Sequence, residues 1–399
     1  MISEEKRIKF LHKYAIPWET MNTIVGGTSP IDLEKLYIRS EESAERFITN
    51  YGFDYSDPQE RFDLRKLYHR AVEFIQEFFL SSEPKLRMPE FFHDLGDVRQ
   101  LLIMVSDSHP QRDWACGILR VMHTMAHAEN FLNREYFPEI RRQIVSRFQR
   151  HVFVDSNGKL WLGEGERRVQ LVRWDVKEEK TFESVVLKLI AKPENVAEDI
   201  FDRLGFRIVT ETKMEALLAI KYLRAFHIIM FPNIKPTRSR NTLLGMDKVR
   251  ERVDKIFEKY FNGELSEEET VQQYYLIDEP PSVSRLEQQK ANPFSREFYS
   301  SIQFTCRQLV RLSHPLVPHL EQMKGIISSV SDDEAKKRLL SIIEHIPIQP
   351  YLKLFFPFEM QVMDEESYHL NMEGLASYEE YKAAQLGAAK KRVLGPLLV

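Results

Sequence analysis

The chain has 399 residues, enough for two domains or for one enlarged domain. Its composition is 43% hydrophobic and 29% charged, as in ordinary globular proteins, and its net charge of −4 excludes a global basic field that attracts nucleic acid. No apolar run is long enough to span a membrane, and the first residues lack the apolar segment of a signal peptide.

Residues 1–137 are predicted to form an all-α module. Ser29 and Pro30 have the pattern of an N-cap followed by a proline at the first helical position. Pro58 begins a second helix, in which apolar residues recur at helical spacing. Further helices are expected at about 97–106, 111–133 and 138–152.

Histidines in this module raise the question of a metal site. His123 and His127 are four residues apart and share one helix face, and His93 stands beside an aspartate. We favour a structural role, with His123 and His127 at a helix interface and His93 in a loop, because no complete ligand set is found. Cys116 and Cys306 lie among apolar neighbours and offer no thiolate metal site, which suits a reducing, cytoplasmic protein.

From residue 152 the hydrophobic pattern changes to the alternation of strands. Residues 152–154 and 159–162 flank an Asn-Gly turn and predict a hairpin, and 169–176 alternates as a further strand. A helix is expected after the central stretch, from about 213 to 230.

The stretch 180–210 predicts a helix, a turn and a strand, and it carries two unusual charges. Asp202 stands three residues before Gly205, and Arg207 lies inside an apolar strand. A charge in a half-buried strand is costly unless it is paired or bound. The pattern leaves open both an Asp202–Arg207 ion pair that pins a loop and a binding site.

A second long apolar strand is predicted over residues 352–362. Glu359 and Gln361 are two residues apart on it and therefore share a face. Asp202 and Glu359 each stand near a strand, and two carboxylates brought together by sheet pairing need a cation between them. Mg²⁺ accepts one or two protein carboxylates and completes its shell with phosphate oxygens and water.

Four short motifs follow one another in this part of the chain. The first two are a lysine four residues before S-V-x-x-K-L, and D-x-x-G-x-R-I. The third is Y-x-S-I-x-x-T, and the fourth is E-x-Q-V followed by G-x-A-x-x-x-x-Y-K. Their positions are Lys180, Ser184, Val185, Lys188, Leu189, Asp202, Gly205, Arg207, Ile208, Tyr299, Ser301, Ile302, Thr305, Glu359, Gln361, Val362, Gly374, Ala376, Tyr381 and Lys382.

In order and internal spacing these motifs resemble those of the RelA/SpoT-type alarmone synthetases, over about 138–232 and 298–390. The resemblance implies an α+β fold, a nucleotidyltransferase-like mixed sheet flanked by helices. It assigns this fold to 138–399, after the N-terminal helical module of 1–137. Two segments, at about 232–297 and 311–348, are then insertions.

The resemblance also implies an activity, the Mg²⁺-dependent transfer of pyrophosphate from ATP to the ribose 3′-hydroxyl of a guanosine nucleotide such as GDP or GTP. Lys180, Ser184, Lys188 and Arg207 would bind the nucleotide phosphates. Asp202 and Glu359 would hold the metal ion. The resemblance also implies that Glu359 accepts the proton of the attacking hydroxyl, with Gln361 beside it. Tyr299 and Gln303 are implied on the acceptor side.

The chain departs from the family pattern at three positions. Glu178 stands where the family has arginine, Gln303 where it has histidine, and Met363 where it has arginine. Two alternatives therefore stay open: pyrophosphorylation of a tRNA 3′ end, and a catalytically lapsed domain that binds a nucleotide or a partner. A basic groove would mark the first, and its candidate residues are Lys235, Arg238, Arg240, Lys248, Arg250 and Arg252.

Overall fold

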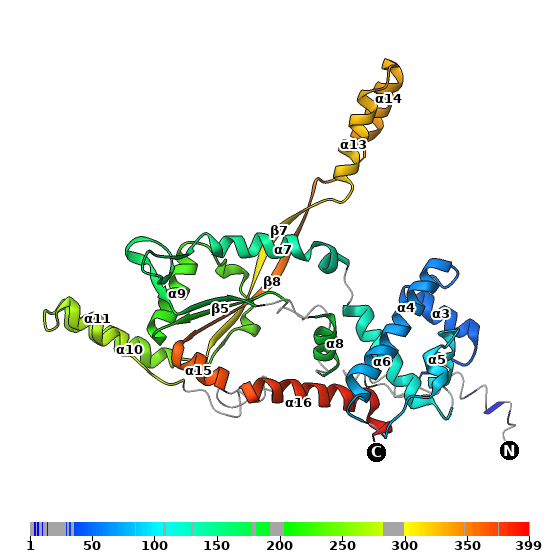
Figure 1. The fold of residues 1–399 in the computed structure, drawn as a ribbon, viewed down its shortest axis with the longest axis horizontal. Helices are drawn as coiled ribbons and strands as arrows, with labels where there is room; N and C mark the ends of the chain where they lie inside the picture. Colours follow the sequence, from blue (N-terminus) through cyan, green and yellow to red (C-terminus); the bar gives the residue numbers. More distant parts are fainter. Residues whose placement is uncertain are drawn as a thin grey trace. The chain divides into compact units, whose positions relative to one another are not determined.

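Figure 1 shows the computed structural model of the chain. From residue 36 onward the structure describes all residues except 84, 107–108, 129–130, 178–180, 192–202, 282–298, 347, 374 and 399. Of the first 35 residues it describes 4, 6, 7, 10, 14, 29 and 32.

The chain divides into two compact units that are each built from separate segments. The first comprises Met1–Asn130, Lys180–Ile200 and Ala376–Val399, and the second comprises Phe131–Glu179 and Phe201–Leu375. The expected boundary at residue 137 therefore differs from the observed division. Two stretches that the sequence places in the second domain group with the N-terminal helices instead.

The first unit is helical in its described part. Helix α4 begins as predicted at Pro58, where the Asp57 side chain accepts from the Gln59 amide and caps the helix. The predicted helix at 97–106 is also present, as α5. The helices are α3 (Glu41–Tyr51), α4 (Pro58–Phe74), α5 (Arg99–Ser106), α6 (Arg112–Ala128), α8 (Phe182–Ala191) and α16 (Leu375–Leu394), with a π-helix at Ile75–Leu80 and 3₁₀ turns at Glu90–His93 and Gly395–Leu397.

Helix α6 is the centre of this unit. Trp114, Ile118 and Val121 on it are buried, and a methyl group at Gly117 would lie only 3.2 Å from the Val393 carbonyl oxygen. Arg120 donates to the carbonyl oxygens of Arg392 and Val393 at 3.0 and 3.2 Å. The C-terminal end of the chain is thereby packed onto α6.

The second unit begins with α7 (Phe131–Gln149). The sequence predicted a helix starting at Pro138, but this proline lies inside α7. Proline removes one helical hydrogen bond without ending the helix here, and residues 137, 140, 144 and 148 still bury apolar side chains at helical spacing.

A small antiparallel sheet follows, with the order β1 (Val152–Val154), β2 (Leu160–Leu162), β3 (Val169–Leu171). The predicted Asn-Gly hairpin is confirmed: Gly158 has φ +77, and the Asp155 carboxylate accepts from the amides of Asn157 and Lys159. The predicted strand 169–176 is interrupted at Val172, where the chain leaves this sheet and enters the next one.

The main sheet of the second unit has five strands in the order β4-β5-β8-β7-β6. Strands β5 and β8 are parallel, and the other neighbours are antiparallel, so the sheet is mixed. The α+β class expected from the sequence is confirmed. The strands are β4 (Arg173–Val176), β5 (Gly205–Thr210), β6 (Arg240–Asn241), β7 (Ile302–Ser313) and β8 (Tyr351–Asp364).

One face of this sheet is apolar and is covered by α7 and α9 (Lys213–Ala225). Phe148 of α7 stacks on Phe206 with ring centroids 4.3 Å apart, and it also contacts Trp174 and Phe358. Such aromatic pairs add about 0.5–1.5 kcal/mol each beyond the burial of their surface. Because side chains alternate along strands, the polar residues between these aromatics lie on the opposite face.

Helix α9 is shorter than the 213–230 expected from the sequence. It begins with a capping box, in which the Thr212 hydroxyl and the Glu215 carboxylate each accept from the other residue's amide. It ends at Ala225, and His227 then takes a left-handed conformation with φ 54.

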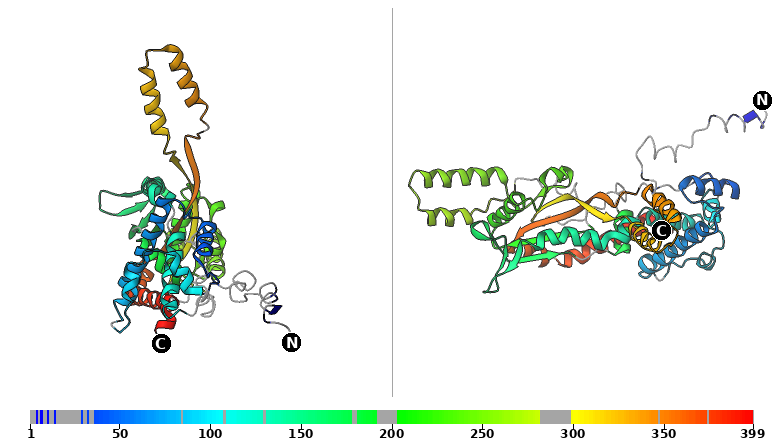
Figure 2. Two further views of the ribbon diagram at one scale, coloured as in Figure 1. Left: turned by 90° about the vertical axis from the view of Figure 1, so that its right-hand side faces the viewer. Right: turned by 90° about the horizontal axis from the view of Figure 1, so that it is seen from above.

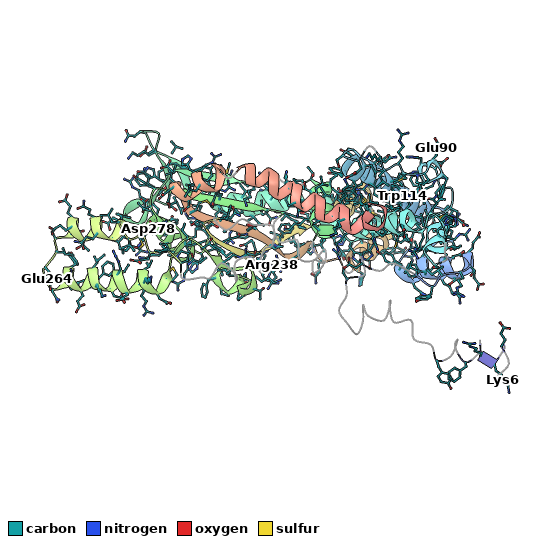
Figure 3. The ribbon with its side chains drawn as sticks, turned by 90° about the horizontal axis from the view of Figure 1, so that it is seen from below. Lys6, Glu90, Trp114, Arg238, Glu264 and Asp278 are labelled. Carbon is teal, nitrogen blue, oxygen red and sulfur yellow. The ribbon has the colours of Figure 1, made fainter. Side chains whose placement is uncertain are left out.

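The two expected insertions form helical hairpins within the second unit (Figure 2). The first contains α10 (Met246–Phe261) and α11 (Glu267–Tyr275), and Ser266 and Glu269 form a capping box at the start of α11. Figure 3 labels Glu264, in the turn between these helices, and Asp278, beyond α11. The second contains α13 (Val317–Ser328) and α14 (Asp333–Glu344), which connect the ends of β7 and β8.

Within the described part of the chain, no helix combines the length and the hydropathy needed to cross a membrane.

Candidate functional site

The polar face of the main sheet carries a row of polar residues, one from each strand. Asp175 pairs with Arg207, Arg207 with Gln361, Gln361 with Gln303, and Gln303 with Arg240. Directly paired residues place their side chains on the same face about 5 Å apart. Three candidates from distant parts of the sequence, Arg207, Gln303 and Gln361, are therefore neighbours.

Glu359 lies one step along this face, paired with Gly205 of β5 and Thr305 of β7. It is only 7% exposed. Its Oε1 atom accepts hydrogen bonds from Gln303 Nε2 at 2.5 Å and from Gln361 Nε2 at 2.9 Å. The two amides hold this oxygen of the carboxylate in place.

Lys177 provides the cation next to Glu359. Its Nζ atom is 3.9 Å from Glu359 Oε1, and its amide donates to the Gly205 carbonyl. A methyl group at Gly205 would meet the Lys177 Cδ atom at 2.8 Å, so the glycine leaves space for this side chain to pass. Gly205 belongs to one of the sequence motifs. Lys177 belongs to none of them, and it is assigned to the site only because β4 pairs with β5.

The second carboxylate oxygen of Glu359 has different surroundings. Among the described residues, Oε2 accepts no hydrogen bond, while both amides and the lysine converge on Oε1. A carboxylate with one oxygen held and the other available can serve as a metal ligand or a proton acceptor.

Tyr299 and Gln361 extend the same network. The Tyr299 hydroxyl donates to Gln361 Oε1 at 3.1 Å, so a chain of hydrogen bonds runs from Tyr299 through Gln361 to Glu359. Burial raises the pKa of Tyr299, with a smaller opposing effect from the Arg207 charge and a further upward effect from Glu359. Tyr299 is therefore kept as a neutral hydrogen-bond donor.

Arg207 is the most unusual residue of this face. Its Nε atom is buried and has no hydrogen-bond partner within the described parts of the chain. The guanidinium group lies 5.6 Å from the Tyr368 ring centre, and an Nη atom is 4.0 Å from the thioether sulfur of Met372, a weak acceptor.

No described carboxylate neutralises Arg207. Asp175, its neighbour across the sheet, is engaged by Arg173 Nε at 2.7 Å instead. The Asp202–Arg207 ion pair that the sequence left open involves Asp202, which lies outside the described residues, and the ion pair of Glu359 within them is with Lys177. A partly buried guanidinium with an unused donor is suited to an anionic ligand.

Helix α15 (Glu365–Glu373), which directly follows β8, packs over this face. Tyr368 on it lies over both Arg173 and Arg207. Asn371 fixes the segment before β7, since it accepts from the Ser300 amide and donates to the Ser300 carbonyl. These residues carried no motif signal, and only their position after the strand could have suggested them.

The other residues expected at the site lie either outside the described residues or in the first unit. Lys180 and Asp202 lie outside the described residues, as does Glu178. Ser184 and Lys188 lie on α8 as predicted, but α8 belongs to the first unit, so their part in the site stays a prediction. The strand that follows Asp202 does pair with the strand of Glu359, as expected, through Gly205.

Two of the basic residues expected to mark a groove, Lys235 and Arg240, lie beside or in the main sheet. Arg240 takes its place on β6 opposite Gln303, and the Lys235 amide donates to the Thr305 carbonyl at 2.9 Å. In contrast, Arg250 and Arg252 on α10 have carboxylate partners, Asp254 at 4.0 Å and Glu279 at 2.7 Å.

The histidines of the first unit form a helix contact. Tyr51 of α3 shares a hydrogen bond of 2.8 Å with His123 Nδ1 of α6, and the rings of His123 and His127 are 4.4 Å apart. Burial, with a contribution from the charge of His127, lowers the pKa of His123 to about 4. His93 ends a 3₁₀ turn rather than lying in a loop, and it contacts Gln76 at 2.9 Å.

Fold and site together define an α+β protein whose mixed sheet presents, on one polar face, a buried carboxylate and a guanidinium that has no carboxylate partner among the described residues. Comparisons with protein-family models, with curated proteins and with solved structures find no match to this chain.

Proposed function

We propose that the second unit is a nucleotidyltransferase-like domain of the RelA/SpoT type. Its reaction would move the β,γ-pyrophosphate of ATP to a hydroxyl of a guanosine nucleotide or a related acceptor. The observation that carries this proposal is the joint placement of Glu359 and Arg207 on one sheet face. These two residues come from two of the motifs that resemble the family.

The electrostatics of this face suit a polyphosphate. Arg207 has an unused donor and no described carboxylate partner, so a phosphate oxygen would satisfy a group that is otherwise costly to bury. Arg240 adds positive charge from β6, where it lies opposite Gln303. Lys177 adds positive charge directly after β4, next to Glu359. Charge that shifts along the transferred pyrophosphate would be stabilised by groups already in position.

Mg²⁺ fits the carboxylate as well. Glu359 would hold it through Oε2, together with Asp202, and the ion would neutralise the triphosphate and polarise the transferred group. Gln303 and Gln361 hold the carboxylate in place through Oε1. In place of metal binding, Oε2 of Glu359 could instead take the proton of the attacking hydroxyl, since the two amides hold only Oε1.

Two of the three departures from the family pattern fall on the acceptor side, whereas the third, Glu178 in place of an ATP-side arginine, lies outside the described residues. Met363, where the family has arginine, is 1% exposed, so this position offers no charge to an acceptor. Gln303, where the family has histidine, donates to Glu359. Tyr299 remains as a half-exposed aromatic ring for stacking on a base. These features favour retained ATP chemistry with an altered acceptor, including a tRNA 3′ end.

The decisive experiment is to incubate the full chain with γ-labelled ATP, Mg²⁺ and a panel of GDP, GTP and tRNA. Label that appears on an acceptor, and disappears with Glu359→Gln, supports the proposal. If the wild-type protein neither labels an acceptor nor gains thermal stability with an ATP analogue, the domain is a catalytically lapsed one.

A further inference from the structure

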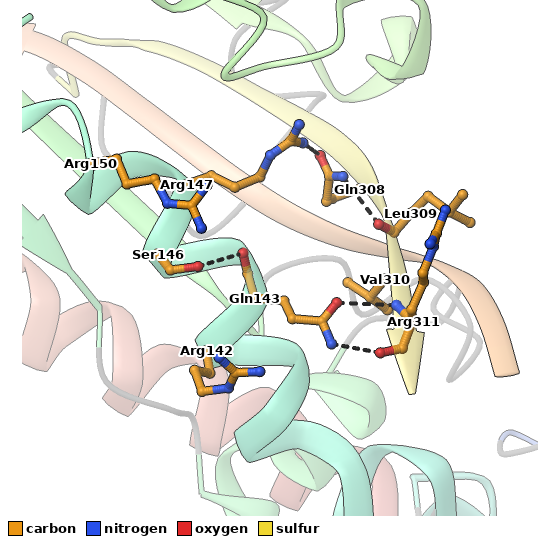
Figure 4. A pocket seen from close by; sticks show the side chains of 9 residues that line it. All are labelled: Arg142, Gln143, Ser146, Arg147, Arg150, Gln308, Leu309, Val310 and Arg311. Atoms are coloured by element: carbon orange, nitrogen blue, oxygen red, sulfur yellow. Dashed lines mark hydrogen bonds between the residues drawn. The ribbon is translucent and has the colours of Figure 1, made fainter. Parts of the chain in front are cut away.

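A basic groove lies in the second unit between α7 and β7, apart from the network of Glu359 (Figure 4). Its volume is about 410 Å³. Gln308 and Val310 belong to its lining. Thr305, which pairs with Glu359, is an odd number of residues away from both on β7. Because side chains alternate along a strand, Gln308 and Val310 lie on the face opposite to Glu359. The lining residues are Arg142, Gln143, Ser146, Arg147, Arg150, Gln308, Leu309, Val310 and Arg311.

The positive charge in this groove is mostly uncompensated. Arg142 forms a double hydrogen bond with Glu139, with both contacts at 2.7 Å. Arg147 is half-buried and donates to the side-chain oxygen of Gln308, a neutral group. Arg150 and Arg311 have no carboxylate within 4.0 Å among the residues that the structure describes. Among the described residues, the groove thus has one arginine with a carboxylate partner and three without one.

These charges are arranged along a line. Arg142 and Arg150 are eight residues apart on α7, which corresponds to about 12 Å along the helix axis. Arg147 lies between them in the sequence, and Arg311 of β7 also belongs to the lining of the groove. A single phosphate group is too small to reach all of these arginines. A linear polyanion, with one charge per about 3.4 Å of each strand, can reach them.

The groove is preformed by contacts between its two walls. Gln143 donates through Nε2 to the Arg311 carbonyl at 2.6 Å and accepts through Oε1 from the Arg311 amide at 3.1 Å. Arg147 and Gln308 join the walls a second time. Binding would therefore not require the walls to be ordered first.

We propose that this groove binds the phosphodiester backbone of a nucleic acid without reading its sequence. The lining has cations, amides and a hydroxyl, which bind phosphate oxygens, and no aromatic side chain on which bases could stack. The net charge of the chain is −4, so this attraction is local to the groove and differs from a general basic field. This inference goes beyond the proposed transfer reaction and does not depend on it.

The test measures binding of fluorescently labelled single-stranded RNA, duplex RNA and duplex DNA to the full chain by anisotropy, from about 50 to 200 mM salt. Arg150→Glu with Arg311→Glu should weaken binding at least tenfold. It should also reduce the slope of log K against log salt by about 1.4–1.8, as expected when two phosphate contacts are lost. Thermal unfolding of each variant checks that the chain is folded.

A matched control reverses two exposed arginines elsewhere, Arg46→Glu with Arg338→Glu, and makes the same change in net charge. It should bind like the wild type. Three results would each overturn the proposal. They are equal weakening in both double variants, no salt-dependent binding at all, and binding of inorganic polyphosphate but not of nucleic acid. Glu359→Gln should leave this binding intact, so failure here is distinguishable from failure of the transfer reaction.

Discussion

Gln303 of β7 donates to Oε1 of Glu359 on β8, although its direct partner across the two strands is Gln361. The diagonal contact places two amide donors on one carboxylate oxygen and leaves the other oxygen without a hydrogen bond among the described residues. A histidine at position 303 would change protonation near neutral pH, whereas glutamine remains a neutral donor.

Glu359→Gln tests the chemistry of this carboxylate. Glutamine keeps an acceptor oxygen for Gln303 and Gln361 but removes the charge and the basic oxygen. We expect pyrophosphoryl transfer to fall by roughly 10²–10⁴. The thermal unfolding temperature should stay within a few degrees of wild type. Transfer at the wild-type rate, or a large loss of stability, would contradict the role given to Glu359.

Arg207→Ala tests the anion site. Because the guanidinium group lacks a described carboxylate partner, its removal should weaken the binding of an ATP analogue without leaving an uncompensated acid behind. The unfolding temperature should rise with the analogue in wild type, and this rise should shrink strongly in the variant. Arg46→Ala, an exposed arginine of the first unit, is the control and should keep the full shift.

Gly163→Ala should destabilise the second unit severely. Gly163 has φ +86, and a methyl group there would lie 2.2 Å from the Tyr222 ring. Tyr222 contacts His151 at 3.1 Å and packs on Phe226, so it cannot simply move away.

The matched control is Gly158→Ala, at φ +77 with nothing within 4 Å of the added methyl group. It should cost about 1 kcal/mol for the backbone conformation alone. Gly163→Ala should cost at least about 2 kcal/mol more, since overpacking adds to the strain. Denaturant unfolding of both variants gives the difference, and equal losses would show that Tyr222 yields to the methyl group.

His123 should make the first unit sensitive to acid. The unfolded chain takes up a proton near pH 6.5, but the folded protein does so only near pH 4, because burial lowers the pKa of His123. The free energy of unfolding should therefore fall as the pH is lowered from about 6.5 to 4. The Tyr51 hydroxyl shares a hydrogen bond with His123 Nδ1, and in the protonated ring this nitrogen can only donate.

His123→Asn offers a neutral acceptor in a similar place and should flatten this pH dependence. Thermal unfolding between pH 4 and 8 compares the two proteins. Identical curves would mean that other groups control the acid response.

Local signals in the sequence predicted much of the second unit. The Asn-Gly hairpin and the shared face of Glu359 and Gln361 both depend on residues close together in the chain. The capping boxes at Thr212 and Ser266 are equally local signals, since each depends on residues three positions apart. The break at Val172 was not predictable, since it depends on which of two sheets each half of the strand joins.

The residues of the site were likewise predicted only where the sequence itself carries a local signal. Arg207 and Glu359 carried motif signals and are indeed on one face. Lys177 and Tyr368 have no motif, and they reach the face only because β4 pairs with β5 and α15 folds back over the sheet. The arginines of the groove were missed because α7 and β7 are distant in sequence, and only their packing adds their charges together.

Gln143 has a consequence for the behaviour of the protein in concentrated solution. Its amide gives Arg311 the two backbone hydrogen bonds that an adjacent strand would otherwise provide. An open strand edge is a template for pairing with another molecule, and proteins protect such edges in several ways. Here one helical side chain closes the edge at this point, so Gln143→Ala would create a starting point for intermolecular strand addition and aggregation.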